Sequence, residues 1–337
     1  MKPTHFLLMA FAVILFVSCN NDNDRTNKHY SAKDFFAEAV KKSSQTVELN
    51  TSDLPQTVTL RGGTKITIKE GTFTKKGTPL SGDFTLEARE FLKPSDIVLN
   101  GLNTLYRDGS PLISDGFLYL NVSQDGVPVD QILAKNLLVE IPNDDTRYQT
   151  QLWEGGKDTV DNREQFTWDD FPADALNGDI DQGVLQEGNW VWRDQKQGSA
   201  SFAFNLGKLG WYNCDVFWDS SNGKTTIYVK LTGYVGELAS YQGYFGDTFV
   251  FFCGKSDNVV AQLYTPLQGV FGVQSYENSM PVGKIGKIIA FAIKEGKFYF
   301  AVKDNVTIEA DLSLELDLKE TTKEEIQTEF AKLDNFK

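Results

Sequence analysis

Five acidic side chains lie among tryptophans between residues 153 and 219, and these residue types could support chemistry on sugars. The acids are Glu154, Asp169, Asp170, Asp215 and Asp219, and the tryptophans are Trp153, Trp168, Trp190 and Trp192. Two suitably spaced carboxylates suffice for glycoside hydrolysis, and indole rings present flat apolar faces on which sugars can stack. Acidic side chains are abundant here and usually solvated, while tryptophans more often pack in a core. A carboxylate-dependent glycoside hydrolase is therefore a minor alternative, and the four tryptophans are candidate glycan-binding residues.

The positions of the two histidines argue against histidine-dependent catalysis and histidine-ligated zinc. The only two histidines are His5, in an apolar leader, and His29, in a polar stretch. This removes Ser-His-Asp and Cys-His nucleophiles and the common zinc sites, and no phosphate-binding glycine loop is present. Asn177 to Gly183 alternates oxygen ligands as calcium loops do, but lacks the glutamate at position twelve. We predict no enzyme activity, no cofactor and no metal.

The N-terminus has the layout of an export signal. Lys2 precedes an unbroken apolar run from Phe6 to Val17, which is too short to span a membrane. Phe16 to Cys19 resembles the lipobox of bacterial lipoproteins, with Phe16 in place of the usual leucine. We therefore expect a signal peptide over 1–18 and a diacylglycerol thioether on Cys19. The alternatives are an ordinary signal peptide that ends at a cysteine, or an uncleaved anchor.

The net charge of −13 argues against nucleic acid as a partner, because an acidic surface repels phosphate. The polar residues that follow Cys19 show no periodicity and predict a tether over 19–30. The remaining partners are the membrane, through the N-terminal lipid, and an unidentified glycan or protein.

The rest of the chain predicts a mainly β protein of two antiparallel β-sandwich-like domains with short N- and C-terminal helices. Capping boxes at Ser31 and Thr322 begin the two helices. Between them, short segments alternate apolar and polar residues and are separated by turn pairs such as Asp115-Gly116. The expected divisions are an N-terminal domain at 31–142, an irregular Trp- and Asp-rich connection at 143–198, and a C-terminal domain at 199–337.

Two cysteines remain after Cys19, and both lie in aromatic, strand-like segments. An exported chain permits a disulfide between Cys214 and Cys253, and each residue also fits as a small buried apolar side chain. The sequence leaves both alternatives open.

Several motifs resemble those of a family of uncharacterised cell-envelope lipoproteins of the Bacteroidota. In the first half they are Gly63 to Ile68, Gly71 to Phe73, Gly77 to Gly82 and Leu86 to Glu90; in the second half, Leu209 to Asp215 is similar to a Gly-Trp-x-Asn-Cys-Asp signature. The resemblance implies an outer-membrane lipoprotein, periplasmic or cell-surface, with β-domains and no established activity. It marks Trp211, Asn213 and Asp215 as signature residues, for which we expect a structural role. Our prediction is a noncatalytic binding or structural module, with a carbohydrate-binding accessory lipoprotein as the alternative.

Overall fold

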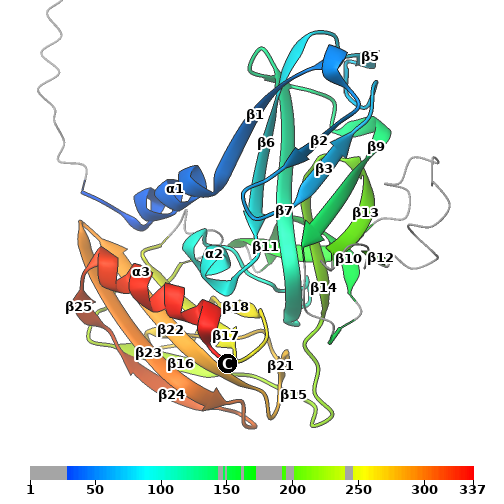
Figure 1. The fold of residues 1–337 in the computed structure, drawn as a ribbon. Coiled ribbons are helices and arrows are strands. Elements are labelled where there is room, and N and C mark those ends of the chain that lie inside the picture. Colours follow the sequence, from blue (N-terminus) through cyan, green and yellow to red (C-terminus); the bar gives the residue numbers. More distant parts are fainter. Residues whose placement is uncertain are drawn as a thin grey trace, which may run out of the picture.

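The computed structural model describes residues 29–142, 147–148, 150–160, 163–171, 192–194, 201–239 and 246–337. The described chain is built mainly of strands in antiparallel sheets, with a few short helices (Figure 1), which confirms the predicted mainly β fold class. Cys19, Trp190 and the 177–183 loop lie outside the described residues.

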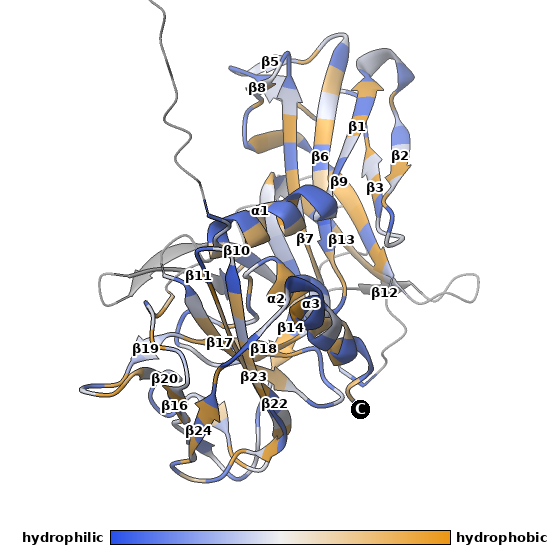
Figure 2. Cartoon of the chain, turned by 90° about the vertical axis from the view of Figure 1, so that its left-hand side faces the viewer, coloured by the Kyte–Doolittle hydropathy of each residue, from blue (hydrophilic) through white to orange (hydrophobic). Residues whose placement is uncertain are grey.

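The N-terminal unit is a sandwich of two antiparallel sheets. Sheet A contains, in order, β1 (Ser44–Asn50), β6 (Asp83–Phe91), β7 (Leu112–Gln124), β14 (Gly210–Phe217), β10 (Gln151–Val160) and β11 (Arg163–Asp170), with β8 (Val127–Pro128) beside β7. Sheet B contains β12 (Trp192–Asp194), β13 (Ser201–Lys208), β9 (Ile132–Pro142), β3 (Lys65–Ile68) and β2 (Gln56–Thr59). A small hairpin joins β4 (Thr74–Lys75) to β5 (Thr78–Pro79). Alternating residues such as Leu118, Leu120 and Val122 fill the space between the two sheets, and Figure 2 shows this alternation along the strands.

The C-terminal unit has the same two-sheet plan. Sheet C contains β18 (Val260–Leu263), β17 (Thr248–Gly254), β22 (Ile285–Lys294), β23 (Lys297–Thr307) and β25 (Lys319–Thr321). Sheet D contains β19 (Thr265–Pro266), β20 (Gly272–Gln274), β16 (Tyr228–Thr232) and β24 (Ser313–Asp317), and β16 pairs with β24 in parallel. A further pair joins β15 (Lys224–Thr225) to β21 (Met280–Pro281). Ile227, Val229 and Leu231 alternate along the chain, and all three are buried between these sheets.

The expected domain boundaries do not follow the strand pairing. Segments 201–208 and 210–217, predicted to open the C-terminal domain, pair instead with β9 and β7 of the N-terminal sandwich. The connection at 143–198 is not irregular where it is described, because β10 and β11 form a hairpin on sheet A. Alternation predicts a strand and its buried face, but it carries no information about which sheet the strand joins.

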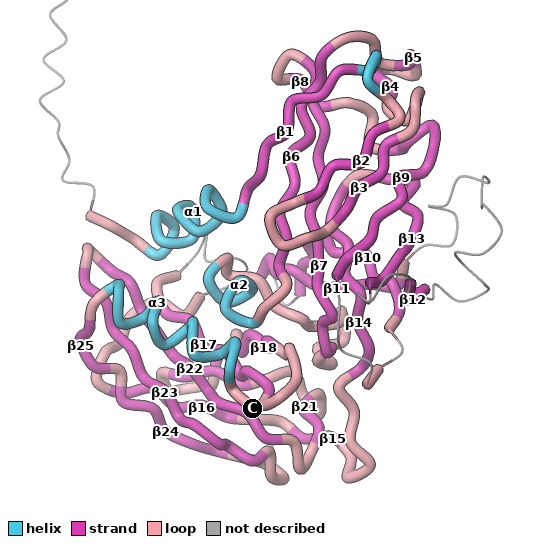
Figure 3. The backbone as a smooth tube through the Cα atoms, in the orientation of Figure 1, coloured by secondary structure: helices cyan, strands magenta, loops and turns pink. Residues whose placement is uncertain are grey.

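Helices and aromatic side chains fill the space between the two units. The helices are α1 (Ala32–Ser43), α2 (Pro94–Leu99) and α3 (Lys323–Ala331), with short 3-10 turns at Thr51–Asp53 and Lys332–Asn335; Figure 3 shows α1 and α2 between the two sets of strands. We call the buried residues of this region the central layer; they include Phe35 and Phe36 of α1, Phe117 and Trp168 of sheet A, Phe249 and Phe291 of sheet C, and Phe330 of α3. The layers run in the order B, A, central layer, C and D. One apolar cluster therefore ties both sandwiches together.

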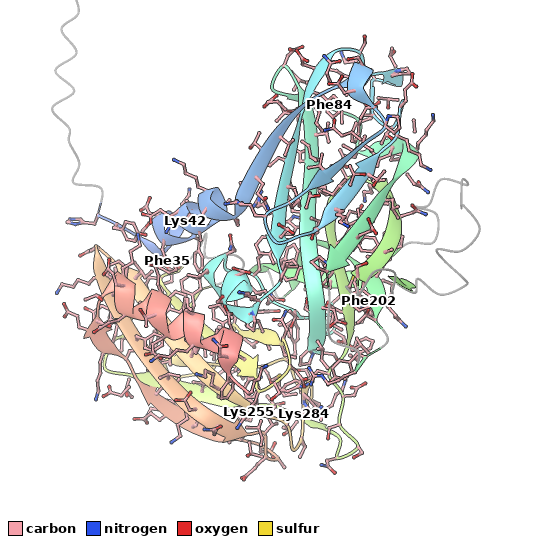
Figure 4. The ribbon with its side chains drawn as sticks, in the orientation of Figure 1. Phe35, Lys42, Phe84, Phe202, Lys255 and Lys284 are labelled. Carbon is pink, nitrogen blue, oxygen red and sulfur yellow. The ribbon has the colours of Figure 1, made fainter. Side chains whose placement is uncertain are left out.

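Both predicted capping boxes are confirmed. Ser31 Oγ accepts a hydrogen bond from the Asp34 amide, and Asp34 Oδ2 accepts one from the Ser31 amide at 3.0 Å. Thr322 and Glu325 form the same reciprocal pair at the start of α3. Helix α1 packs into the central layer, and Figure 4 labels Phe35 on it.

Candidate functional site

Two of the four tryptophans predicted to bind a glycan are buried in the core. Trp153 is 2% exposed and Trp168 is fully buried. Their indole nitrogens donate to the backbone oxygens of Asp215, at 3.0 Å, and Asn103, at 2.9 Å. Trp190 and the side chain of Trp192 lie outside the described residues. The hypothesis of a sugar-stacking surface is therefore wrong for Trp153 and Trp168, whose rings support the sheet instead.

The candidate catalytic acids lie in three different surroundings. Glu154 and Asp169 are partners across β10 and β11, so the structure does bring this pair together. Each has its own cation, however: Lys208 for Glu154, and Arg107 for Asp169 at 2.8 Å.

The other three acids are apart from that pair. Asp170 accepts a hydrogen bond from the Tyr106 hydroxyl at 3.0 Å, and Asp219 lies 3.4 Å from Lys224. Asp215 is completely buried within sheet A. None of the five acids lines any of the three cavities characterised in the described part of the chain.

The signature residues of β14 occupy the face of sheet A that carries the central layer. Trp211 packs against Phe91 and Tyr119, with ring centroids 5.7 and 4.8 Å apart. Asn213 is fully buried and accepts a hydrogen bond from Ser114 Oγ at 2.8 Å. The packing of Trp211 and the buried hydrogen bond of Asn213 support the prediction of a structural role, and their strand is central in sheet A.

A β-bulge interrupts sheet A opposite this signature. Asn213 pairs with Phe117 and Asp215 pairs with Ser114, so Asp115 and Gly116 together face Cys214. The prediction of a turn at Asp115-Gly116 is wrong, because β7 continues through both residues. The uninterrupted apolar segments on either side of this pair are a signal that could have identified a bulge within a strand.

The bulge surrounds a buried carboxyl group. Asn213 Nδ2 donates to Asp215 Oδ2, and the Gly116 amide donates to Ser114 Oγ at 3.2 Å. Asp215 Oδ1 has no hydrogen-bond partner, and no lysine or arginine of the described chain forms an ion pair with Asp215. Burial, followed by the negative charge of Asp115, holds the pKa of Asp215 well above its ordinary range.

A cavity of about 290 Å³ lies beside this bulge, between the two β-units. Its lining includes Ser114 and Asp115 from sheet A, Asn258 from the loop after β17, and Arg147. The Ser114 amide donates to the Asn258 backbone oxygen at 2.9 Å, which fixes that loop against the bulge. We call this region the bulge site; its polar residues are Ser114, Asp115, Asn213, Asp215 and Asn258.

The outer wall of the same cavity is held by Asp257. Its carboxylate accepts from Arg147 Nη1 and Tyr148 Oη, each at 3.0 Å, and from Trp218 Nε1 at 2.9 Å. The Asp257 carboxylate therefore has three hydrogen-bond donors. The next residue, Asn258, differs, because its side-chain oxygen is buried and has no hydrogen-bond partner.

Cys214 and Cys253 are both free, buried thiols, so the disulfide considered from the sequence does not form. Cys214 belongs to the core between sheets A and B, whereas Cys253 lies in the central layer. Burial raises the pKa of Cys253 to about 12 and that of Cys214 well above its ordinary value. Neither thiol is activated as a nucleophile.

Comparison with known proteins gave no match to a family model, to a curated protein or to a solved structure. The arguments about function therefore come from the residues and their geometry. Within the described residues, no helix is long and apolar enough to cross a membrane.

Proposed function

We propose that this chain is a lipid-anchored cell-envelope protein that serves as a noncatalytic binding or structural module of the outer membrane, on its periplasmic or cell-surface side. Cys19 carries the lipid, and the two sandwiches form the body that the lipid holds at the membrane. The resemblance to envelope lipoproteins of the Bacteroidota supports this assignment.

The observation that carries the proposal is the attachment of the body to the segment that follows Cys19. The Tyr30 carbonyl accepts a hydrogen bond from the Gly296 amide at 2.8 Å, and the Tyr30 ring lies 5.7 Å from that of Phe298. Helix α1 then enters the central layer directly. Residues 20–29 can span at most about 35 Å when fully extended. A lipid on Cys19 would therefore hold both sandwiches, joined by one core, close to the membrane surface.

The two alternatives have less support. A glycan-binding surface would depend on Trp190 and Trp192 alone, because the rings of Trp153 and Trp168 are buried. A hydrolase would depend on Glu154 and Asp169, each of which has a separate cation.

Cys19→Ala tests the anchor, because only the cysteine sulfur can carry the thioether. We expect the variant to lose metabolic labelling by an alkyne fatty acid and to leave the membrane fraction. Ser18→Ala is the matched control: it keeps a small residue before the cysteine and should remain labelled and membrane-bound. A wild-type protein without acyl mass, or a Cys19→Ala variant that stays in the membrane, would contradict the proposal.

A further inference from the structure

Helix α1 presents one exposed face to the outside of the molecule. Its inner side carries Phe35 into the central layer, whereas Lys33, Ala37, Lys41 and Lys42 are exposed. Residues four apart in a helix lie on the same side, so Lys33, Ala37 and Lys41 form one row. We call these four exposed residues the α1 face; Figure 4 labels Lys42 near the end of the helix.

The acids of α1 do not neutralise this face. Asp34 is held in the capping box with Ser31, and Glu38 forms an ion pair with Lys323. The hydrogen bond from Lys323 is the main reason that the pKa of Glu38 lies below its ordinary value, and the charge of Lys42 contributes less. Within the described residues, none of the three lysines of the α1 face forms an ion pair. Three positive charges are therefore available to an anionic partner.

Helix α1 is also the first described helix after the expected lipidation site. Tyr30 lies two residues before its start at Ala32, and Lys323 Nζ is 4.7 Å from the centre of the Tyr30 ring. From Ala32 to Lys41 the helix rises about 14 Å. Residues 20–29 can span at most about 35 Å. A lipid on Cys19 can therefore reach the surface beside every lysine of the α1 face.

We propose that the α1 face lies against the membrane surface, with its three lysines at the phosphate groups of anionic phospholipids. This orientation rests on the proposed lipid anchor, because the lipid brings the face within reach of the headgroups. Near an anionic membrane each lysine favours contact by about fivefold. Three lysines are fewer than the roughly four to eight of segments that bind membranes by charge alone. The α1 face would thus orient a body that the lipid already holds.

The charge of the rest of the chain favours the same orientation. The net charge is −13, so an anionic surface repels most of the molecule and attracts the α1 face. Such attraction decays over about 10 Å at 0.1 M salt, which gives lysines close to the anchor the largest effect. Figures 1 and 2 show β24 on the far side of the C-terminal unit from α1, so β24 would point away from the headgroups.

A fluorophore on the α1 face tests this orientation in the full lipidated chain. Ala37→Cys supplies an exposed thiol for labelling, whereas Cys214 and Cys253 are buried. The labelled protein is reconstituted in vesicles of phosphatidylcholine, alone or mixed with phosphatidylglycerol, and nitroxide headgroups serve as quenchers. We expect phosphatidylglycerol to increase the quenching of this label about threefold or more. Salt at about 1 M, where the Debye length is about 3 Å, should abolish the increase. Ser313→Cys, exposed at the start of β24, is the control label and should be quenched little in either vesicle.

Charge-neutral variants identify the groups that act. Replacing the three lysines of the α1 face, as Lys33→Gln, Lys41→Gln and Lys42→Gln together, should return the quenching to its value in phosphatidylcholine. The matched control removes three exposed lysines elsewhere and should keep the increase: Lys69→Gln, Lys76→Gln and Lys303→Gln.

The outcomes separate the orientation from the anchor. Equal quenching of the Ala37→Cys and Ser313→Cys labels, on a chain that carries acyl mass, would overturn the orientation and leave the anchor standing. An increase that survives the triple variant of the α1 face, or that the control triple removes equally, would also overturn it. A purified chain without acyl mass would contradict the anchor and the orientation together.

Discussion

The two sheets that face the central layer each contain a β-bulge. The buried ionisable group beside each bulge has different neighbours in the two sheets. In sheet A, Asp115 and Gly116 face Cys214 beside the buried Asp215. In sheet C, Asp304 and Asn305 of β23 face the buried Lys287, whose register partner on β17 is Cys253. Each bulge therefore lies next to a buried cysteine and a buried ionisable group.

The two buried groups differ in whether an oppositely charged side chain lies beside them. Lys287 Nζ is 2.9 Å from Asp304 Oδ1 and 4.6 Å from the centre of the Phe336 ring. Asp215 has only neutral donors on one oxygen, and the nearby Asp115 charge opposes its ionisation. The bulge in sheet C thus holds an ion pair on its buried lysine, whereas no lysine or arginine of the described chain forms an ion pair with Asp215 in sheet A.

The largest expected effect concerns the glycine beside the bulge in sheet C. A Cβ at Gly286 would lie 2.3 Å from the Phe252 ring and 2.5 Å from the Cys253 carbonyl oxygen. Neither can move easily, because Phe252 is fully buried and the oxygen belongs to the backbone. Gly286→Ala should therefore lower the free energy of unfolding in urea by about 3 kcal/mol. Gly156→Ala, with open space around its Cβ, is the control and should change little.

A smaller loss is expected at the bulge in sheet A. Gly116 has φ +119°, and its Cβ would come within 2.9 Å of Leu92 Cδ2, a flexible side-chain end. Gly116→Ala should cost about 2 kcal/mol, mainly through backbone strain. The control Gly126→Ala has a positive φ of 72° but open space, and should cost about 1 kcal/mol. If Gly116→Ala lowered the free energy of unfolding more than Gly286→Ala does in the same urea series, the bulge in sheet A would be the more rigid of the two.

Much of the fold could be predicted because its signals are local. The capping boxes at Ser31 and Thr322 depend on residues three apart, and the buried faces of β7 and β16 follow from period-two alternation. In β17 and β22, by contrast, almost every residue is buried, because sheet C is covered on both faces. Alternation then disappears, and the central layer could not be predicted from it.

The candidate site was harder to predict because it depends on pairing between distant segments. Asp215 could be singled out from its signature, but Asp115 had the sequence of a turn, and Asn258 had no pattern at all. Only the register of β14 against β7 and the contact from Ser114 to Asn258 bring these residues together. The stacking role of Trp153 and Trp168 was wrong for a related reason, since composition does not show which face of a strand a ring occupies.

The smallest expected effect concerns the ion pair between Lys287 and Asp304. The Lys287 side chain is 7% exposed, whereas that of Asp304 is 55% exposed, so solvent screens part of the attraction. Asp304→Asn should therefore lower the free energy of unfolding by about 1 kcal/mol or less, measured by urea denaturation. The matched control is Glu315→Gln, which removes the Lys230 pair of similar length with both side chains half exposed, and should have no measurable effect. Equal results for the two variants would mean that the ion pair of the buried Lys287 contributes no more stability than an exposed pair, and would contradict the contrast drawn between the two bulges.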